Sequence, residues 1–308
     1  MTDAITVHEL TKRYGDFAAV DGISFAIPAG RLVAVLGPNG AGKTTTIEIL
    51  EGFSAPSSGE VRVLGVEPLR GGRRWRARVG LVLQSTSLET EPTVAELLSL
   101  FGRLYPNPRP VPEVLELIDL ADDAKARVGT LSGGQQRRVD LGLAIIGNPE
   151  VLFLDEPTTG LDPEARRRCW ATVRRFNDAG TTVLLTTHYL DEADQLADRV
   201  MVLSGGRVVA DKTPADLRAG SGVSRIRYPL PLGAPLDDLP PALASHLDLI
   251  DRVLSVRTDQ VRPVLADLVA WAGRHRLDLA ALEVGPPSLE EAYLSLAGHL
   301  DVLELERA

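Results

Sequence analysis

Apolar and polar residues alternate along this chain with two different periods. Residues 31–36, 151–154 and 182–187 form apolar runs that are typical of buried strands in a parallel sheet. Residues 93–104 instead carry apolar side chains three and four positions apart, which predicts an amphipathic helix with one buried face. Strands and helices that alternate in this way after residue 31 indicate an α/β fold.

Shorter sequence patterns predict the other helices and strands in the first two thirds of the chain. Residues 1–30 predict short strands with turns, one of them at Asp21–Gly22. Thr93 and Glu96 form a capping box at the start of the amphipathic helix. The other expected elements are strands at 58–66 and 79–84, helices at 43–52, 112–119 and 135–147, and a hairpin of 200–203 with 207–210.

The composition of the sequence changes near residue 215. Residues 217–224 are rich in Gly and Ser and resemble a linker. Beyond them the sequence predicts strands at 253–258 and 277–284, a helix at 261–275, and a second capped helix that starts at Ser288 with Glu291. We therefore expect a first domain at 1–220 and a small C-terminal α/β domain at 221–308.

Composition and charge narrow the class of protein. The chain has 308 residues, of which 44% are hydrophobic and 24% charged, and no apolar run is long enough to span a membrane. A net charge of −9 disfavours non-specific binding to nucleic acid or to anionic membranes, which needs an excess of Lys and Arg. The single cysteine, Cys169, excludes an internal disulfide and is consistent with a reducing compartment. No secretory signal is expected at the N-terminus.

One glycine-rich segment predicts the chemistry. The spacing of Gly37, Gly42, Lys43 and Thr44 matches the phosphate-binding loop G-x-x-x-x-G-K-[ST]. Glycines let the backbone N–H groups surround a phosphate, and the following helix presents its positive N-terminal end. A glycine-rich turn with a chance lysine is the alternative, but the strand before the loop and the helix after it disfavour it. The nucleotide-binding residues expected here are Gly37, Pro38, Asn39, Gly40, Ala41, Gly42, Lys43, Thr44 and Thr45.

Two further motifs follow in order. Ser132, Gly133, Gly134 and Gln135 precede a helix and could form a second anion site. The strand at 151–154 ends in Asp155 and Glu156. An aspartate at this place can orient Mg²⁺, and a glutamate after it can polarise a water for attack on the γ-phosphate. These two acids could also merely end a strand, but that alternative leaves the other motifs unexplained.

Taken together, these motifs resemble those of the ATP-binding cassette (ABC) ATPases, which drive ABC transporters. The resemblance covers roughly residues 3–215. It implies the fold of a phosphate-loop (P-loop) NTPase of the ABC type, with an N-terminal antiparallel β subdomain and a helical subdomain. It also implies that ATP and Mg²⁺ are bound, and that two subunits sandwich the ATP between the phosphate loop of one and the Ser132–Gln135 motif of the other.

The same resemblance assigns roles to single residues. Tyr14 corresponds to the aromatic that stacks on adenine, although it could equally be an exposed strand aromatic. Gln84 corresponds to a ligand of Mg²⁺ and of the attacking water, and Thr44 and Asp155 are the other expected metal contacts. His188 corresponds to the switch histidine near the γ-phosphate. Asp162 lies in the loop 159–162 that crosses to the other subunit.

The tail narrows the resemblance further. Residues 287–294 resemble the closing motif of ATPases similar to the daunorubicin-resistance ATP-binding family, which pair with separate permeases of the ABC-2 exporter type. This implies an ATP hydrolase on the cytoplasmic side of the plasma membrane, docked to its permease through a groove near residues 84–101. Its dimer partner would be a second copy or a paralogous cassette. The exported compound would be a drug, antibiotic, lipid or polysaccharide.

The sequence disfavours two other functions. A soluble ABC-type ATPase that acts on ribosomes or DNA is disfavoured, because the sequence has one cassette and no coiled-coil heptads or cysteine clusters. A regulatory nucleotide-binding module without turnover is disfavoured by Glu156, which a degenerate site would lack.

Overall fold

The protein is described by a computed structural model in two compact units, Met1–Pro214 and Ala215–Ala308. Each unit is considered by itself. The described residues are 2–83, 88–220, 222–244, 247–248, 252–294 and 296.

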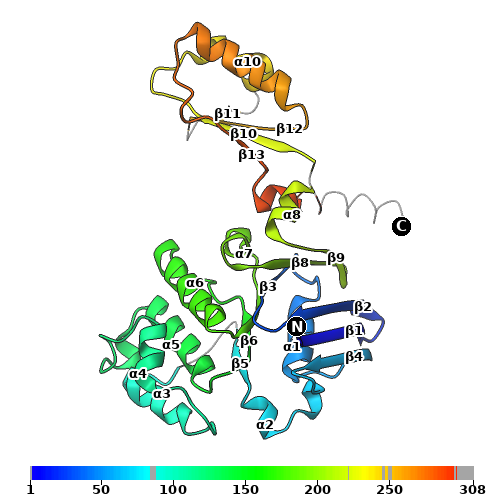
Figure 1. Cartoon of the computed structure of the whole chain (residues 1–308), viewed down its shortest axis with the longest axis vertical. Coiled ribbons are helices and arrows are strands. Elements are labelled where there is room, and N and C mark those ends of the chain that lie inside the picture. Colours follow the sequence, from blue (N-terminus) through cyan, green and yellow to red (C-terminus); the bar gives the residue numbers. More distant parts are fainter. Residues whose placement is uncertain are drawn as a thin grey trace. The chain divides into compact units, whose positions relative to one another are not determined.

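A six-stranded sheet forms the centre of the first unit, in the order β5-β6-β7-β3-β8-β9 (Figure 1). The first five strands are parallel and β9 pairs antiparallel with β8. The strands are β3 (Leu32–Leu36), β5 (Val79–Val82), β6 (Val151–Asp155), β7 (Thr182–Thr186), β8 (Arg199–Ser204) and β9 (Arg207–Lys212). Every residue of β3 and β7 is buried, which explains the uninterrupted apolar runs and confirms the predicted parallel strands.

Helices connect these strands. Thr93 caps α3 with Glu96 as the capping box predicts. The α-helices of the first unit are α1 (Lys43–Glu51), α2 (Arg73–Arg76), α3 (Val94–Gly102), α4 (Val111–Leu117), α5 (Gly133–Ile145), α6 (Pro163–Asp178) and α7 (Leu190–Leu196). In Figure 1 the group α3, α4 and α5 lies on the side of the sheet away from β1, β2 and β4.

The N-terminal segment forms a second, antiparallel sheet in the order β2-β1-β4. Its strands are β1 (Asp3–Tyr14), β2 (Phe17–Pro28) and β4 (Ser58–Val63). The turn predicted at Asp21–Gly22 is wrong, because both residues lie inside β2. The Gly22 N–H donates to Thr11 Oγ1 at 3.2 Å, and the Asp21 N–H donates to the Gly206 carbonyl at 2.9 Å. Asp21 therefore attaches β2 to the β8–β9 hairpin.

The second unit contains a four-stranded antiparallel sheet in the order β11-β12-β10-β13. Its hydrophobic core includes Trp271 and Tyr228. Its elements are α8 (Pro214–Ala219), β10 (Ser224–Pro229), α9 (Pro241–Ala244), β11 (Leu247–Asp248), β12 (Val253–Thr258), α10 (Val261–Arg274) and β13 (Glu283–Gly285). Helix α8 takes up part of the expected linker, and the strand expected at 277–284 is shorter and begins at Glu283. The capping box of Ser288 and Glu291 is present.

Candidate functional site

The glycine-rich loop lies where the sequence predicts, between β3 and α1. Two of its glycines have no room for a side chain. A Cβ on Gly37 would lie 2.4 Å from the Leu203 carbonyl oxygen, and one on Gly42 would lie 2.4 Å from that of Ala19. Gly42 also has φ +98°, a left-handed conformation that favours glycine. The loop therefore keeps this shape only with glycine at both positions.

Lys43 is held inside this loop. Its side chain is almost fully buried, and Nζ donates to the carbonyls of Gly37 (2.7 Å) and Pro38 (3.0 Å). Burial lowers the pKa of Lys43, whereas the nearby carboxylates of Glu156 and Asp155 act to raise it. The lysine is thus held in the loop, within the electrostatic reach of both acids at the end of β6.

An open pocket of about 390 Å³ joins the loop to other predicted site residues. Tyr14 and Phe17 stand on its rim, directly opposite each other where β1 turns into β2, and they are 52% and 63% exposed. Phe17 is a site residue that the sequence analysis missed, although its place across a two-residue turn from Tyr14 was a signal. The pocket is lined by Tyr14, Phe17, Ala19, Asn39, Gly40, Gly42, Lys43, Thr44, Thr45 and Glu156.

The two acids are positioned by the neighbouring strand. Thr186 at the end of β7 donates a short hydrogen bond to Asp155, and its carbonyl accepts the Glu156 N–H at 3.1 Å. Glu156 has φ +45°, a strained backbone conformation for a residue other than glycine. Its Oε2 lies 3.4 Å from His188 Nδ1 and accepts from Thr159 Oγ1 at 3.1 Å. The structure therefore brings Glu156 and His188 together beside the phosphate loop.

The oxygen ligands near the loop suit magnesium. Thr44 is exposed and lines the pocket, and the Asp155 carboxylate is near enough to Lys43 to raise its pKa. Mg²⁺ prefers such oxygen ligands and commonly combines one or two protein groups with phosphate oxygens and waters. No cluster of three or more His, Cys, Asp or Glu ligands occurs in the described part of the chain. Gln84, the other expected ligand, lies outside the described residues.

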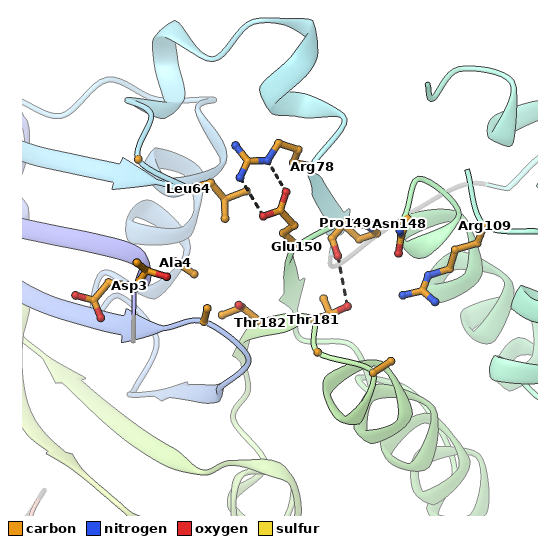
Figure 2. Close-up of a pocket in the computed structure, with 15 residues that line it drawn as sticks. Asp3, Ala4, Leu64, Arg78, Arg109, Asn148, Pro149, Glu150, Thr181 and Thr182 are labelled. Carbon is orange, nitrogen blue, oxygen red and sulfur yellow. Dashed lines mark hydrogen bonds and ion pairs between the residues drawn. The ribbon is translucent and has the colours of Figure 1, made fainter. Parts of the chain in front are cut away.

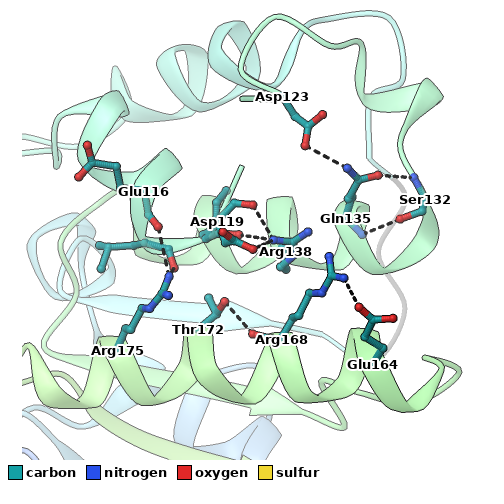
Figure 3. Close-up of polar contacts among 12 residues, drawn as sticks. Glu116, Asp119, Asp123, Ser132, Gln135, Arg138, Glu164, Arg168, Thr172 and Arg175 are labelled. Carbon is teal, nitrogen blue, oxygen red and sulfur yellow. Dashed lines mark hydrogen bonds and ion pairs between the residues drawn. The ribbon is translucent and has the colours of Figure 1, made fainter. Parts of the chain in front are cut away.

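The second glycine motif begins helix α5 (Figure 3). Ser132 Oγ accepts the Gln135 N–H at 3.3 Å, and Gln135 Oε1 accepts the Ser132 N–H at 3.0 Å. Gln135 Nε2 donates to Asp123 at 3.0 Å. One turn along, the buried Arg138 binds the Asp119 carboxylate at 2.9 Å. These contacts fix the start of α5 in one conformation.

Asp162 has a structural contact of its own. It caps α6 by accepting the N–H groups of Ala165 (2.8 Å) and Glu164 (2.9 Å), and these bonds, that of Ala165 first, lower its pKa. Asp162 and Ser132 line a separate pocket of about 310 Å³ that shares no residue with the pocket at the phosphate loop. The two motifs thus line two separate pockets in the described part of the chain.

A larger cavity of about 560 Å³ lies elsewhere (Figure 2). It is found where the parallel strands begin, beside Glu150, Thr182 and the Arg78–Glu150 ion pair. None of the predicted site residues lines it. The phosphate loop lies instead after the carboxyl end of β3, the usual ligand edge of a parallel α/β sheet.

Two family models match the chain. One, described as ABC transporter, covers residues 20–159, and another, described as ABC transporter domain-containing protein-like, C-terminal domain, covers residues 224–288. The daunorubicin resistance ATP-binding protein DrrA3 of Streptomyces coeruleorubidus is 41% identical over 96% of each chain. The Nod factor export ATP-binding protein I of Paraburkholderia xenovorans is 40% identical over 96% of this chain and 97% of its own.

Solved structures resemble the first unit's fold. CbiO1 of Clostridium perfringens, part of the ABC transporter complex cbiONQ, is 29% identical with a TM-score of 0.64, over 71% of this chain and 92% of its own. The ATP-binding cassette MJ0796, a dimer in a post-hydrolysis state bound to ADP and Pi, is 25% identical with a TM-score of 0.59, over 68% of this chain and 98% of its own.

Proposed function

The chain belongs to the ATP-binding proteins of the ABC transporter family, and we propose that it powers an exporter whose membrane-spanning part is a separate protein. As a family member it is an ATP-hydrolysing enzyme with the P-loop NTPase fold. The names of the relatives, which refer to drug resistance and to Nod factor export, support export as the direction of transport. They give no support to action on ribosomes or DNA.

We assign a role to each residue at the pocket. The loop N–H groups and Lys43 hold the phosphates, and Tyr14 with Phe17 offers aromatic surface to the adenine. Thr44, Asp155 and Gln84 would hold Mg²⁺, which neutralises charge that develops on the phosphate oxygens. Glu156 accepts the proton of the attacking water. His188, whose Nδ1 lies 3.4 Å from Glu156 Oε2, keeps Glu156 aligned with the γ-phosphate.

One observation carries the proposal that the protein works as a dimer. The phosphate loop with Glu156 and the Ser132–Gln135 motif with Asp162 line two pockets that have no residue in common. Two copies arranged about a twofold axis would place each motif opposite the partner's loop and complete two equivalent sites. The dimeric state of the MJ0796 cassette supports this arrangement. We propose in the same way that residues 1–220 form the ATP-binding domain and 221–308 an accessory domain.

The permease would dock in a groove of about 410 Å³ beside α3 and α5. Its walls include Trp75, Phe101, Tyr105 and Leu143, with Glu51 at the end of α1. An apolar groove of this kind suits a short amphipathic segment of a partner protein. In the described part of the chain no helix is long and apolar enough to cross a membrane. We propose that a separate permease, of the ABC-2 type that the tail motif suggests, holds this subunit at the cytoplasmic face of the membrane.

The test is to capture the complex in its ATP-bound state. Tagged Glu156→Gln protein is used to pull down partners from detergent-solubilised host membranes with ATP and Mg²⁺, and a Phe101→Glu variant of the same protein serves as the matched control. We expect a stoichiometric protein with several membrane spans that Phe101→Glu fails to retain. Recovery of ribosomes, DNA or soluble proteins alone would contradict the transporter proposal.

A further inference from the structure

A carboxyl group with no assigned role is buried in the first unit. Glu192 on α7 has no exposed surface, and its Oε1 accepts from Thr158 Oγ1 at 3.0 Å and from Trp170 Nε1 at 2.9 Å. Burial raises the pKa of Glu192, whereas hydrogen bonding from the side chains of Thr158 and Trp170 acts in the opposite direction. Both bonds use Oε1, which can accept two donors because a carboxylate oxygen has two lone pairs, and Oε2 has no hydrogen-bond partner in the described structure.

Glu192 and its two hydrogen-bond partners belong to three different segments around the reaction centre. Thr158 follows Glu156 by two residues and leads into the loop 159–162. Glu192 itself lies on α7, four residues after His188 in the segment that follows β7. In that segment the Thr187 Oγ1 accepts the Tyr189 N–H at 2.9 Å. Trp170 lies on α6, the helix that begins after this loop. The buried carboxyl thus connects the segment after β6, the segment after β7 and α6.

A second contact joins the same elements. Arg166, one turn before the tryptophan on α6, places its guanidinium 3.9 Å from the centre of the Tyr189 ring. That ring lies 4.1 Å from the ring of His188, and Arg166 also pairs with Asp191 at 3.6 Å. Helix α6 therefore contacts the histidine segment at two points on one face, which makes the three segments a connected packed unit.

We propose that Glu192 is a positioning residue for ATP hydrolysis, because it holds the His188 segment in a fixed position relative to Thr158 and the loop 159–162, which follow Glu156. This inference rests on the proposed function of the same site. The Glu156–His188 contact of 3.4 Å joins groups from two different strand ends, so it needs a fixed relation between them. Without the shared acceptor, the buried hydroxyl and indole donors lose their partner, and the two segments are free to separate.

The direct test compares Glu192→Ala with the conservative Glu192→Gln, which retains one acceptor oxygen. Full-length protein is assayed for ATP turnover and for MANT-ATP affinity, with melting temperature as the control for folding. We expect Glu192→Ala to lower kcat by roughly 10- to 100-fold, because a misplacement of about 1 Å has an effect of this size, while KM and nucleotide affinity change less than threefold. Glu192→Gln should recover a large part of kcat. A folded Glu192→Ala protein with normal kcat would overturn the proposal.

A double-mutant cycle keeps the proposal testable if Glu192→Ala does not fold. Thr158→Val and Trp170→Phe each remove one hydrogen-bond donor to the Glu192 carboxyl. If both act through the same carboxyl, the loss in kcat of the double variant should be clearly smaller than the product of the two single losses. Losses that multiply would refute the connection, since a purely structural role predicts independent effects.

These outcomes separate the two proposals. If the wild-type protein does not hydrolyse ATP under any condition, the proposed function fails. If it does, and either a folded Glu192→Ala protein keeps a normal kcat or the two losses of the double-mutant cycle multiply, only the positioning role fails.

Discussion

The groove beside α3 contains a glutamate whose titration the structure predicts. Glu51 is 7% exposed, and its Oε1 has no hydrogen-bond partner in the described structure. Burial, with smaller contributions from the carboxylates of Asp155 and Glu48, raises its pKa from 4.5 to about 8. The folded protein therefore binds this proton more tightly than the unfolded chain, so the stability contributed by the group is highest below pH 4.5 and falls as the pH rises towards 8.

The magnitude follows from these two pKa values. Between pH 5 and pH 8.5 the carboxyl lowers the free energy of unfolding by about 4 kcal/mol. For a unit of this size that corresponds to a fall in melting temperature of roughly 8 to 16 °C. Glu51→Gln has no titrating group at this position, so the difference in melting temperature between the variant and the wild type should grow by this amount over the range.

The assay is differential scanning fluorimetry of both proteins at half-unit steps of pH. The matched control is Glu60→Gln, which changes an exposed glutamate of β4 and should follow the wild type in parallel at every pH. A change smaller than about 2 °C in the difference between Glu51→Gln and wild type would refute the reasoning. It would mean that the carboxyl is hydrated in the folded protein.

Three further predictions concern the site and the core. The Glu156→Gln variant should bind ATP with unchanged affinity, and its kcat should be lower by at least about 100-fold, because general-base catalysis contributes about that much. Unchanged turnover would remove Glu156 from the mechanism. Gly42→Ala should weaken MANT-ATP binding and reduce stability by roughly 1–3 kcal/mol, because its Cβ would clash with the Ala19 carbonyl at a strained φ; a protein with wild-type stability would contradict the loop geometry. Cys169 should resist DTNB at pH 8 until the chain unfolds, because burial raises its pKa to about 12; rapid labelling of the folded protein would show the thiol to be exposed.

The sequence alone sufficed for features that local spacing determines. The glycine positions of the phosphate loop impose one backbone conformation. The apolar runs of β3, β6 and β7 are typical of a parallel sheet whose two faces are both buried. The order of the motifs along the chain then gave the family. The roles of the site residues, those of Tyr14 and Asp162 included, stay predictions, and in the structure Asp162 is the cap of α6.

Features that depend on contacts between distant residues escaped the sequence analysis. Glu192 lies 34 positions from Thr158 and 22 from Trp170, so no local pattern connects them. The turn expected at Asp21–Gly22 failed for the same reason, because the hydrogen bond to Gly206 keeps this pair inside β2. Helical periodicity also did not reveal α7, whose seven residues are too few for a clear pattern.

The central claim is that each ATP site combines the phosphate loop of one copy with the Ser132–Gln135 motif of another, and a mixing experiment tests it most directly. Lys43→Ala removes the phosphate-binding lysine, and Gly133→Asp places a negative charge in the second motif at a position where a Cβ meets nothing within 4 Å. Each variant alone should be inactive. Mixed in equal amounts they should recover about a quarter of wild-type ATP turnover, because half of the dimers then hold one intact site of two. A mixture as inactive as its components would contradict the account.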